Sequence, residues 1–513
     1  MYDFGSIVDR NEVEAEMGWN ERDKPKTLYQ MLERTASKYP NRPAASFQLT
    51  SGPTDAKETV TWREMLERST QAANLFRSLG IGEGDVVAFL LPNSLETMYT
   101  LMGAGIAGIV NPINPLLDAE QVAGILRETK AKVLVTLKAF PKAEVAQLAN
   151  EAVAMAPCVE TVLEIDLNRY LSPPKSWLVP LLRPKVPVKH KARVRSFVAE
   201  MNKQNKTLDF ADSPDDRVAA YFHTGGTTGM PKGCVHTHGD MLYTVAAYCG
   251  CAMSNANSQD VVVNFFPMFW IAGEDLGLLA PVYSGAAVCL LHRWDALGWM
   301  AAVTEHRASV VTLLVDNAVE VMRHPDVKNY DLTSLQSSSV CSFVKKLSSA
   351  FREEWRDLTG STMVEAAYGM TETNTCDTFT VGLQHDDYDL QQQPVFVGLP
   401  VPETDIIIRD FDTGELKGIG DTGEICVRSP SVLKSYWNKP DETKHAIRNG
   451  WLHTGDIGMV NERGLVHYLG RRKEMLKVNG MPVFPAESSV CPYLVCDPRL
   501  FPRLGGLRSR GFP

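Results

Sequence analysis

Residues 224–233 read TGGTTGMPKG, directly after an apolar run at residues 218–222, and this stretch decides the fold. Its glycines let backbone N–H groups approach a polyphosphate closely, while the threonine hydroxyls add donors and Lys232 adds positive charge. The pattern differs from the P-loop G-x-x-x-x-G-K followed by Ser or Thr, because Met230 and Pro231 precede Lys232 and no hydroxyl follows it. A flexible turn is the ordinary alternative. We predict a polyphosphate-binding loop outside the P-loop ATPases.

Three shorter motifs follow this loop in chain order. Residues 368–373 read YGMTET, residues 450–456 read GWLHTGD, and residues 470–477 read GRRKEMLK. Taken singly, Thr-Gly-Asp is typical of a turn and Gly-Arg-Arg-Lys of a solvated basic run. All four motifs in this order resemble the adenylate-forming superfamily, which contains acyl-CoA synthetases, peptide-synthetase adenylation domains and beetle luciferases. The chain most resembles a fatty-acid or acyl-CoA synthetase.

The resemblance implies a role for each motif. Tyr368 stacks on adenine, Thr371 contacts the α-phosphate region, and Glu372 holds Mg²⁺, which prefers hard oxygen ligands. Asp456 accepts hydrogen bonds from the ribose hydroxyls, and Arg471 contacts the nucleotide. The implied ATP- and AMP-binding residues are Thr224, Gly225, Gly226, Thr227, Thr228, Gly229, Lys232, Tyr368, Gly369, Thr371, Asp456 and Arg471. The implied catalytic residues are Lys232, Thr371, Glu372 and Arg471.

The resemblance also implies where CoA and the acid bind. The implied hinge and CoA-site residues are Lys473 (the pivot), Lys477 and Gly480. The implied acyl-pocket residues are Trp270, Gly273, Val315 and Ala367. Aliphatic and aromatic neighbours favour an apolar acid, with a medium- or long-chain fatty acid as the first choice and an aryl acid as the second.

The implied reaction uses ATP, Mg²⁺ and coenzyme A. A carboxylate attacks the α-phosphate of ATP, pyrophosphate leaves, and the thiol of CoA then attacks the carbonyl of the acyl-adenylate. Such chemistry needs positioning and charge stabilisation. A nucleophilic Ser or Cys is not required.

An α/β fold is also predicted from the residues themselves. Strand-like runs at residues 86–91, 132–137 and 159–165 alternate with helical patterns that begin near Ser94 and cover residues 119–129 and 142–154. This alternation predicts a parallel sheet, and it returns between residues 261 and 364. After residue 395, short runs at 405–409 and 423–428 between Gly and Pro turns predict a small β-barrel or meander.

The chain, at 513 residues, is too long for one core, since single cores stop growing at about 250–300 residues. The resemblance implies an N-terminal adenylation domain over residues 1–469, built from two α/β subdomains and a distorted β-barrel. It implies a hinge and the start of a C-terminal domain over residues 470–487. The last 26 residues, 488–513, contain no Lys and no periodicity, and they suggest an aberrant tail or a short natural variant. We expect poor catalysis from such a chain.

Two further departures from the family pattern affect the predicted site. The family places a Gly-Ala-rich turn against adenine, whereas residues 337–343 here read SSSVCSF. Small residues are kept, so close backbone approach stays possible. The family often has a His where this chain has Trp270. That residue is either a core aromatic or a wall of the acyl pocket.

Composition limits the partners. The net charge of −9 argues against nucleic acid, whose binding depends on clustered Lys and Arg. The ten cysteines lack disulfide or zinc spacing, the N-terminus lacks the plan of a secretory signal, and the apolar run at residues 97–110 is too short to span a membrane. These features favour a cytoplasmic protein.

Residues 175–195 hold seven Lys and Arg and no acid, with Trp177 and several Leu and Val interleaved. An exposed loop is one interpretation. Contact with an anionic membrane surface is the other. We expect no continuous helix across the stretch, because it contains Pro180, Pro184 and Pro187.

Three other functions remain open. A peptide-synthetase adenylation domain would place an Asp near the substrate amino group, and Asp275 and Asp316 are the candidates. A luciferase-like oxygenase shares the same motifs. A pseudoenzyme would bind nucleotide or acyl groups without catalysis.

Overall fold

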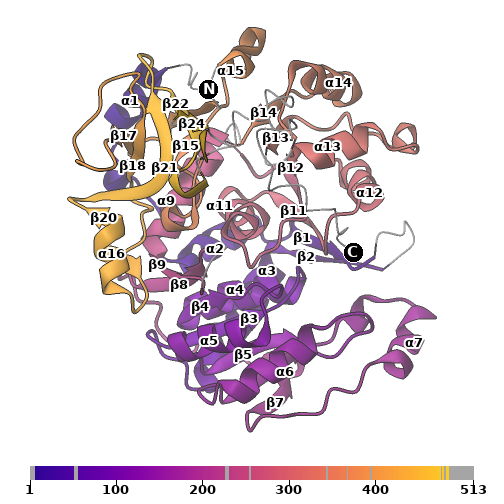
Figure 1. The fold of residues 1–513 in the computed structure, drawn as a ribbon. Helices are drawn as coiled ribbons and strands as arrows, with labels where there is room; N and C mark the ends of the chain where they lie inside the picture. The colour runs from indigo at the N-terminus through magenta and orange to yellow at the C-terminus, as the bar shows by residue number, and fades with distance from the viewer. Residues whose placement is uncertain are drawn as a thin grey trace.

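A computed structural model of the chain (Figure 1) describes residues 6–50, 56–225, 230–252, 256–342, 345–366, 368–392, 396–474, 476–478 and 481–483. Two large α/β sheets and one antiparallel sheet carry the architecture. This arrangement confirms the predicted α/β fold with a separate β-rich part.

The eight-stranded sheet has the strand order β19-β9-β8-β4-β3-β5-β6-β7. It is parallel from β8 to β7, while β9 and β19 are antiparallel additions. Every residue of β3 and β5 is buried, which is typical of parallel strands covered on both faces. The strands are β3 (Val86–Leu90), β4 (Ile109–Pro112), β5 (Val133–Leu137), β6 (Thr161–Ile165), β7 (Arg193–Ser196), β8 (Val218–His223), β9 (Gly233–Thr237) and β19 (Ser435–Tyr436).

The helices between these strands begin at identifiable caps. Ser94 Oγ accepts a hydrogen bond from Thr97 N, and Asp118 and Gln121 form a reciprocal capping box. The predicted helix at residues 119–129 is confirmed, and the one predicted at 142–154 begins three residues later. These helices are α4 (Leu95–Ala107), α5 (Ala119–Thr129), α6 (Val145–Met155), α8 (Phe197–Met201) and α9 (His238–Ala247).

The seven-stranded sheet has the order β14-β13-β12-β10-β11-β1-β2, and only β2 is antiparallel to its neighbour. It confirms the α/β alternation predicted between residues 261 and 364. Its strands are β1 (Pro43–Gln48), β2 (Lys57–Thr61), β10 (Val261–Asn264), β11 (Ala287–Leu291), β12 (Val310–Leu314), β13 (Ser337–Cys341) and β14 (Met363–Glu365). The helices α12 (Ala296–His306), α13 (Val315–Met322) and α14 (Ser349–Thr359) pack beside it.

One buried core joins the two α/β sheets. Helix α3 (Trp62–Ser78) contacts β1 and β2 of one sheet, and it packs on α4, which contacts β3, β4 and β8 of the other. Helices α2 (Leu28–Lys38) and α11 (Ala280–Ser284) complete this layer. Buried Asn93 ties the subdomains together, since its side-chain N–H groups donate to the carbonyls of Phe266 and Leu291 at 3.0 and 3.1 Å.

The third sheet is antiparallel and has the order β15-β16-β22-β21-β18-β17, with β20 beside β21. The predicted strands at 405–409 and 423–428 are confirmed as β17 and β18. Its strands are β15 (Thr378–Phe379), β16 (Phe396–Pro400), β17 (Asp405–Arg409), β18 (Gly423–Arg428), β20 (Ile447–Arg448), β21 (Trp451–Val460) and β22 (Val466–Arg471). The nearby helices are α1 (Ile7–Glu16), α15 (Tyr388–Gln391) and α16 (Pro440–Ala446).

The predicted boundary between residues 469 and 470 falls inside β22. Beyond it, a 3₁₀ turn at Arg472–Glu474 leads to the hairpin of β23 (Leu476–Val478) and β24 (Met481–Val483). Residues 484–513 lie outside the described residues, and the division into 1–469, 470–487 and 488–513 stays a prediction.

The basic stretch at residues 175–195 contains a helix, α7 (Lys175–Leu182), with Pro180 inside it. The helix ends at Leu182, so no continuous helix crosses residues 175–195, as expected. Pro180 has no N–H for the carbonyl of Ser176, four residues earlier, and Asn168 Nδ2 donates to that carbonyl instead at 3.1 Å. Pro184 and Pro187 follow the helix, as predicted from their effect on helix continuation.

Candidate active site

The predicted phosphate loop joins two antiparallel strands, β8 and β9. Thr224 N–H donates to the carbonyl of Lys232 at 3.0 Å, and Lys232 N–H donates to Thr224 Oγ1 at 3.2 Å. These two bonds fix both ends of the loop. Gly225 is exposed, while Gly226, Thr227, Thr228 and Gly229 lie outside the described residues. A hairpin loop confirms the exclusion of the P-loop, which joins a strand to a helix.

Tyr436 on β19 links the phosphate loop to the YGMTET motif. The ammonium Nζ of Lys232 lies 3.9 Å from the centre of the Tyr436 ring, a cation–π contact. Tyr436 Oη donates to Glu372 Oε1 at 2.7 Å. Burial raises the pKa of Tyr436 and the Glu372 carboxylate raises it further, so the phenol stays a donor. Sequence reasoning missed Tyr436, whose only signal was an aromatic residue between two loop segments.

Glu372 lies in a 3₁₀ turn, Thr371–Thr373, which other elements hold in place. The Glu372 carbonyl accepts from Leu433 N–H at 2.7 Å, and the Thr371 carbonyl lies 2.8 Å from His236 Nε2. The second carboxylate oxygen of Glu372, Oε2, has no partner among the described residues. The turn therefore presents one hard oxygen that is suited to a divalent cation.

Tyr368, Asp456 and Arg471 form a second polar group in the third sheet. Tyr368 Oη donates to Asp456 Oδ2 at 2.8 Å, and Arg471 Nε lies 3.3 Å from Asp456 Oδ1. Asp456 and Arg471 are cross-strand partners on β21 and β22. Burial raises the pKa of Tyr368, and the Asp456 carboxylate adds to this. Burial alone would lower the pKa of Arg471, but Asp456 and its other neighbours raise it.

Gly369 is required by a close approach of the backbone. A Cβ atom at this position would lie 1.5 Å from the carbonyl oxygen of Thr375. Any larger residue would push apart the segment that carries Tyr368 and Glu372.

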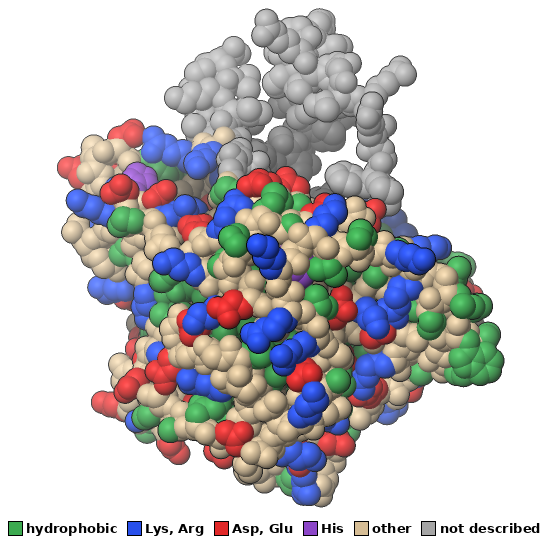
Figure 2. All heavy atoms as spheres, turned by 90° about the horizontal axis from the view of Figure 1, so that it is seen from below, with side chains coloured by type: hydrophobic (Ala, Val, Ile, Leu, Met, Phe, Trp, Pro, Cys, Tyr) green, Lys and Arg blue, Asp and Glu red, His purple; other side chains and the backbone are tan. Residues whose placement is uncertain are grey.

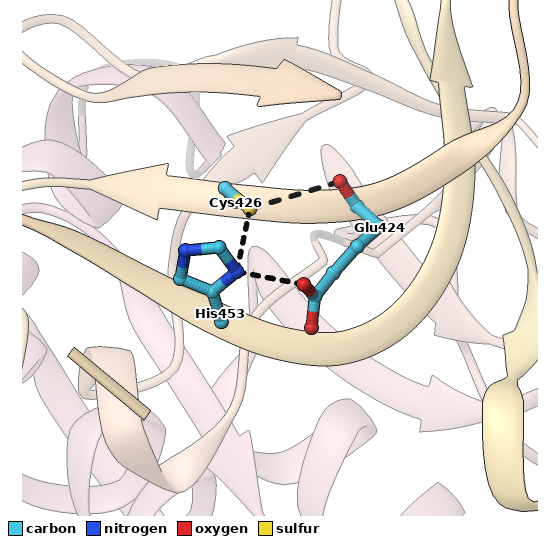
Figure 3. Close-up of side chains that lie close together, drawn as sticks. All are labelled: Glu424, Cys426 and His453. Atoms are coloured by element: carbon cyan, nitrogen blue, oxygen red, sulfur yellow. Dashed lines mark hydrogen bonds and ion pairs between the residues drawn. The ribbon is translucent and has the colours of Figure 1, made fainter. Parts of the chain in front are cut away.

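Glu424, Cys426 and His453 lie together on β18 and β21 (Figure 3). Glu424 Oε2 lies 2.7 Å from His453 Nδ1, and Glu424 Oε1 accepts from Gly455 N–H at 3.1 Å. Cys426 Sγ lies 3.4 Å from His453 Nδ1, and burial raises the pKa of its thiol to about 12. The ligand atoms of the three residues lie within 4.8 Å of one another. Because Glu424 is already occupied by His453 and Gly455, the cluster positions the turn that presents Asp456.

A sequence model described as AMP-binding enzyme matches residues 32–437. The chain belongs to this AMP-binding enzyme family. It is 29% identical over 473 residues to the long-chain-fatty-acid–CoA ligase of Bacillus subtilis (strain 168), which covers 90% of this chain and 80% of that protein. The match confirms the family that the four motifs predicted.

Solved structures share the fold. The chain resembles the anthranilate CoA ligase AuaEII in complex with anthranoyl-AMP, with a TM-score of 0.75, 23% identity, and coverage of 92% of this chain and 83% of that chain. It also resembles the N-terminal domain of FACL13 from Mycobacterium tuberculosis, with a TM-score of 0.68, 22% identity, and coverage of 87% and 99%. These likenesses confirm the fold expected for the AMP-binding family.

The predicted acyl-pocket residues lie in different surroundings in the structure. Trp270 is 37% exposed and meets Phe266 edge-on at 5.6 Å, so the interpretation as a core aromatic is wrong. Gly273 is buried, and a Cβ there would lie 2.1 Å from the Pro267 carbonyl. Val315 is fully buried in the core beside the seven-stranded sheet. Ala367 lies outside the described residues.

In the small-residue segment at 337–343, residues 337–341 form β13 and Ser342 follows the strand. Ser342 donates to both carboxylate oxygens of Glu365, from N–H at 2.8 Å and from Oγ at 2.5 Å. Burial raises the pKa of Glu365 to about 6. Phe343 lies outside the described residues.

The hinge residues lie at the exposed end of β22. Arg471 and Lys473 are exposed, and Arg472 pairs with Asp412 at 2.9 Å. Lys477 is on β23, and Gly480 lies outside the described residues.

The two aspartates suggested for an amine-bearing substrate differ sharply. Asp316 Oδ1 forms an ion pair with Lys345 Nζ at 2.8 Å. Asp275 is buried beside Glu274, and within the described chain none of their four carboxylate oxygens accepts a hydrogen bond. Burial raises the pKa of both groups well above the ordinary range, and for Glu274 the neighbouring Asp275 adds to this. Burial without a partner therefore favours the neutral form of both carboxyls.

We expect Asp275→Asn and Glu274→Gln each to stabilise the protein at pH 8. Below pH ~4 both carboxyls are protonated in the folded and the unfolded chain, so they do not change the free energy of unfolding. As the pH rises, the unfolded chain loses these protons while the folded chain, with its raised pKa values, keeps them. The free energy of unfolding therefore falls with rising pH. Removing one titrating group should gain about 1 kcal/mol or more, since one pKa unit is worth about 1.4 kcal/mol. Urea unfolding at pH 5 and pH 8 measures this, with Asp316→Asn as the control. A variant that is less stable than the parent at pH 8 would mean that the replaced carboxyl makes a favourable interaction that the amide cannot replace.

Proposed function

We propose that this protein is an acyl-CoA synthetase, which joins a carboxylic acid to CoA at the expense of ATP through an acyl-adenylate. The observation that carries the proposal is the link through Tyr436, which contacts Lys232 by its ring and Glu372 by its hydroxyl. One side chain thus joins the phosphate loop to the carboxylate suited to Mg²⁺. The ligase name of the Bacillus subtilis relative supports the same function.

In the first step, a carboxylate oxygen of the acid attacks the α-phosphorus of ATP. A P–O bond forms, the bond to the bridging oxygen breaks, and pyrophosphate leaves. Lys232 and the loop N–H groups stabilise the phosphate charge. Glu372 Oε2 fits Mg²⁺, which when bound would neutralise charge on the phosphate oxygens. Thr371 lies in the same turn and faces the α-phosphate region in this proposal.

The nucleoside end is assigned to the third sheet. We assign the ribose hydroxyls to Asp456 and the adenine to Tyr368. Asp456 already accepts from Tyr368 Oη, so ribose hydroxyls exchange with that contact or add to it. Arg471 lies beside the carboxylate, with its Nε 3.3 Å from Asp456 Oδ1. The cluster of Glu424 and His453 keeps the Gly455 turn in position.

In the second step, the CoA sulfur attacks the carbonyl carbon, a C–S bond forms, and AMP leaves with the C–O bond electrons. We assign residues 1–469 to the adenylation domain and residues 470–487 to the hinge, with Lys473 as its pivot and Lys477 and Gly480 beyond it. The likeness to an N-terminal domain solved alone supports this division.

The acid is proposed to be a long- or medium-chain fatty acid, with an aryl acid as the second candidate. Trp270, Gly273, Val315 and Ala367 are the proposed pocket residues. Pyrophosphate release with ATP, Mg²⁺ and a panel of fatty, aryl and amino acids tests this, followed by thioester yield with CoA. We expect release with fatty acids above all. Release with amino acids alone would favour a peptide-synthetase activity, and none with any acid, despite ATP binding, would favour a pseudoenzyme.

A further inference from the structure

Helix α7 exposes a row of large apolar side chains. Trp177, Leu178, Leu181 and Leu182 are 69%, 50%, 81% and 66% exposed. At 3.6 residues per turn these four positions form one continuous face, while Val179 points to the protein and is buried. Exposed apolar patches of this kind mark interaction sites. The part of the chain that the structure describes does not cover this face.

Unpaired cations surround the apolar face. Arg183 pairs with Asp166 at 2.8 Å and Lys189 with Glu151 at 3.4 Å. Lys185, Lys191 and Arg193 are exposed and have no partner among the described residues. Figure 2 shows hydrophobic side chains at its right edge with Lys and Arg side chains close by, at the position that α7 occupies in Figure 1. Apolar groups beside free cations are complementary to lipid with anionic headgroups.

We propose that α7 and the strand region after it, residues 175–195, dock the protein on an anionic lipid surface. Trp177, Leu181 and Leu182 enter the interfacial layer, and Lys185, Lys191 and Arg193 pair with the headgroups. The helix cannot cross the bilayer, because eight residues at about 1.5 Å each reach about 12 Å, against an apolar core of about 30 Å. No helix in the described part of the chain is long and apolar enough to cross a membrane. The docking does not depend on the proposed reaction.

The first test compares co-sedimentation with vesicles of phosphatidylcholine alone and of phosphatidylcholine mixed with phosphatidylserine, at low salt. The parent chain should bind the mixed vesicles and lose binding as salt is raised, because headgroup attraction is screened within about 8 Å at physiological ionic strength. The double variant Trp177→Ser, Leu181→Ser should bind at least about tenfold more weakly, given the transfer free energy of two large apolar side chains. The matched control is Leu416→Ser, Ile419→Ser, which changes two apolar side chains that are 65% and 69% exposed elsewhere.

A second set of variants tests the charges. Lys185→Gln, Lys191→Gln and Arg193→Gln should each weaken binding by about fivefold, since one basic residue near an anionic surface contributes about 1 kcal/mol. Circular dichroism melts identify any variant that fails to fold, and Lys206→Gln, away from the stretch, is the charge control. Brominated lipid should quench tryptophan fluorescence in the parent chain, and this quenching should be lost in the variant Trp177→Phe.

Two outcomes would overturn the proposal. One is the absence of binding to the mixed vesicles at low salt. The other is that the parent chain forms a concentration-dependent dimer in size-exclusion chromatography, and that the double variant Trp177→Ser, Leu181→Ser loses the dimer but keeps its vesicle binding. That result would mean that the apolar face binds a second copy of the chain. Equal binding to both vesicle types would contradict the role of the cations.

Discussion

Glu372→Gln is expected to lower the rate of acyl-adenylate formation by about 10²–10³-fold, because a preorganised charge at a phosphoryl site is commonly worth that much. The amide keeps the shape of the side chain and can still accept from Tyr436 Oη, whose bond to Glu372 Oε1 measures 2.7 Å. Only the negative charge is lost, and with it the affinity for a hard cation. Pyrophosphate release, measured at saturating ATP over a range of Mg²⁺ concentrations, tests this.

Two further variants separate charge from position. Tyr436→Phe keeps the Glu372 carboxylate and the ring over Lys232 but removes the hydroxyl, so the rate should fall by about tenfold, the equivalent of one hydrogen bond. Glu442→Gln changes an exposed carboxylate on α16 and should have no effect. Near-normal rates for Glu372→Gln across all Mg²⁺ concentrations would show that this carboxylate does not hold the metal.

Asp456→Ala should weaken ATP binding by about 10²-fold and change the rate at saturating ATP far less. Hydrogen bonds to a charged group contribute about 1.5–3 kcal/mol each, and in our proposal the ribose contact is remote from the reacting phosphorus. The substitution also leaves the buried Tyr368 hydroxyl without its 2.8 Å acceptor. Direct ATP titration, together with separate KM and kcat values for pyrophosphate release, measures the effect.

Asp412→Ala is the matched control for Asp456→Ala. Asp412 is an exposed carboxylate that pairs with Arg472, next to Arg471, so its removal tests loss of charge near the hinge without loss of the proposed ribose contact. It should leave ATP binding unchanged. If Asp456→Ala altered only the preference among acids, the assignment of Asp456 to ribose would be wrong.

Much of the fold was predictable because the sequence signals are local. The all-apolar runs of β3 and β5, the cap at Ser94 and the capping box at Asp118 each involve residues within a few positions of one another. The proline rule also held for residues 175–195, because helix α7 ends at Leu182, before Pro184 and Pro187. Pro180 lies inside α7, where the Asn168 side chain donates to the Ser176 carbonyl in place of the N–H that proline lacks.

The candidate site was predictable only in part. The four motifs indicated Lys232, Glu372, Tyr368, Asp456 and Arg471, but neither Tyr436 nor Glu424 carries a distinctive local pattern. Tyr436 meets Glu372 across 64 residues of sequence, and Glu424 meets His453 across 29. The same limit applies to Trp270, whose size suggested burial although it is 37% exposed.

The sequence by itself determined the α/β class, the family, and the residue types that suit phosphate and Mg²⁺, because glycine spacing, hydroxyl donors and carboxylates are properties of short stretches. Only the tertiary structure decided that Tyr436 joins Lys232 to Glu372, that Tyr368 and Arg471 share Asp456, and that α7 exposes an apolar face. Those contacts depend on which strands become neighbours. The pairing of β19 with β9 and of β21 with β22 depends on burial of the whole core. It does not depend on the site residues that these pairings bring into contact.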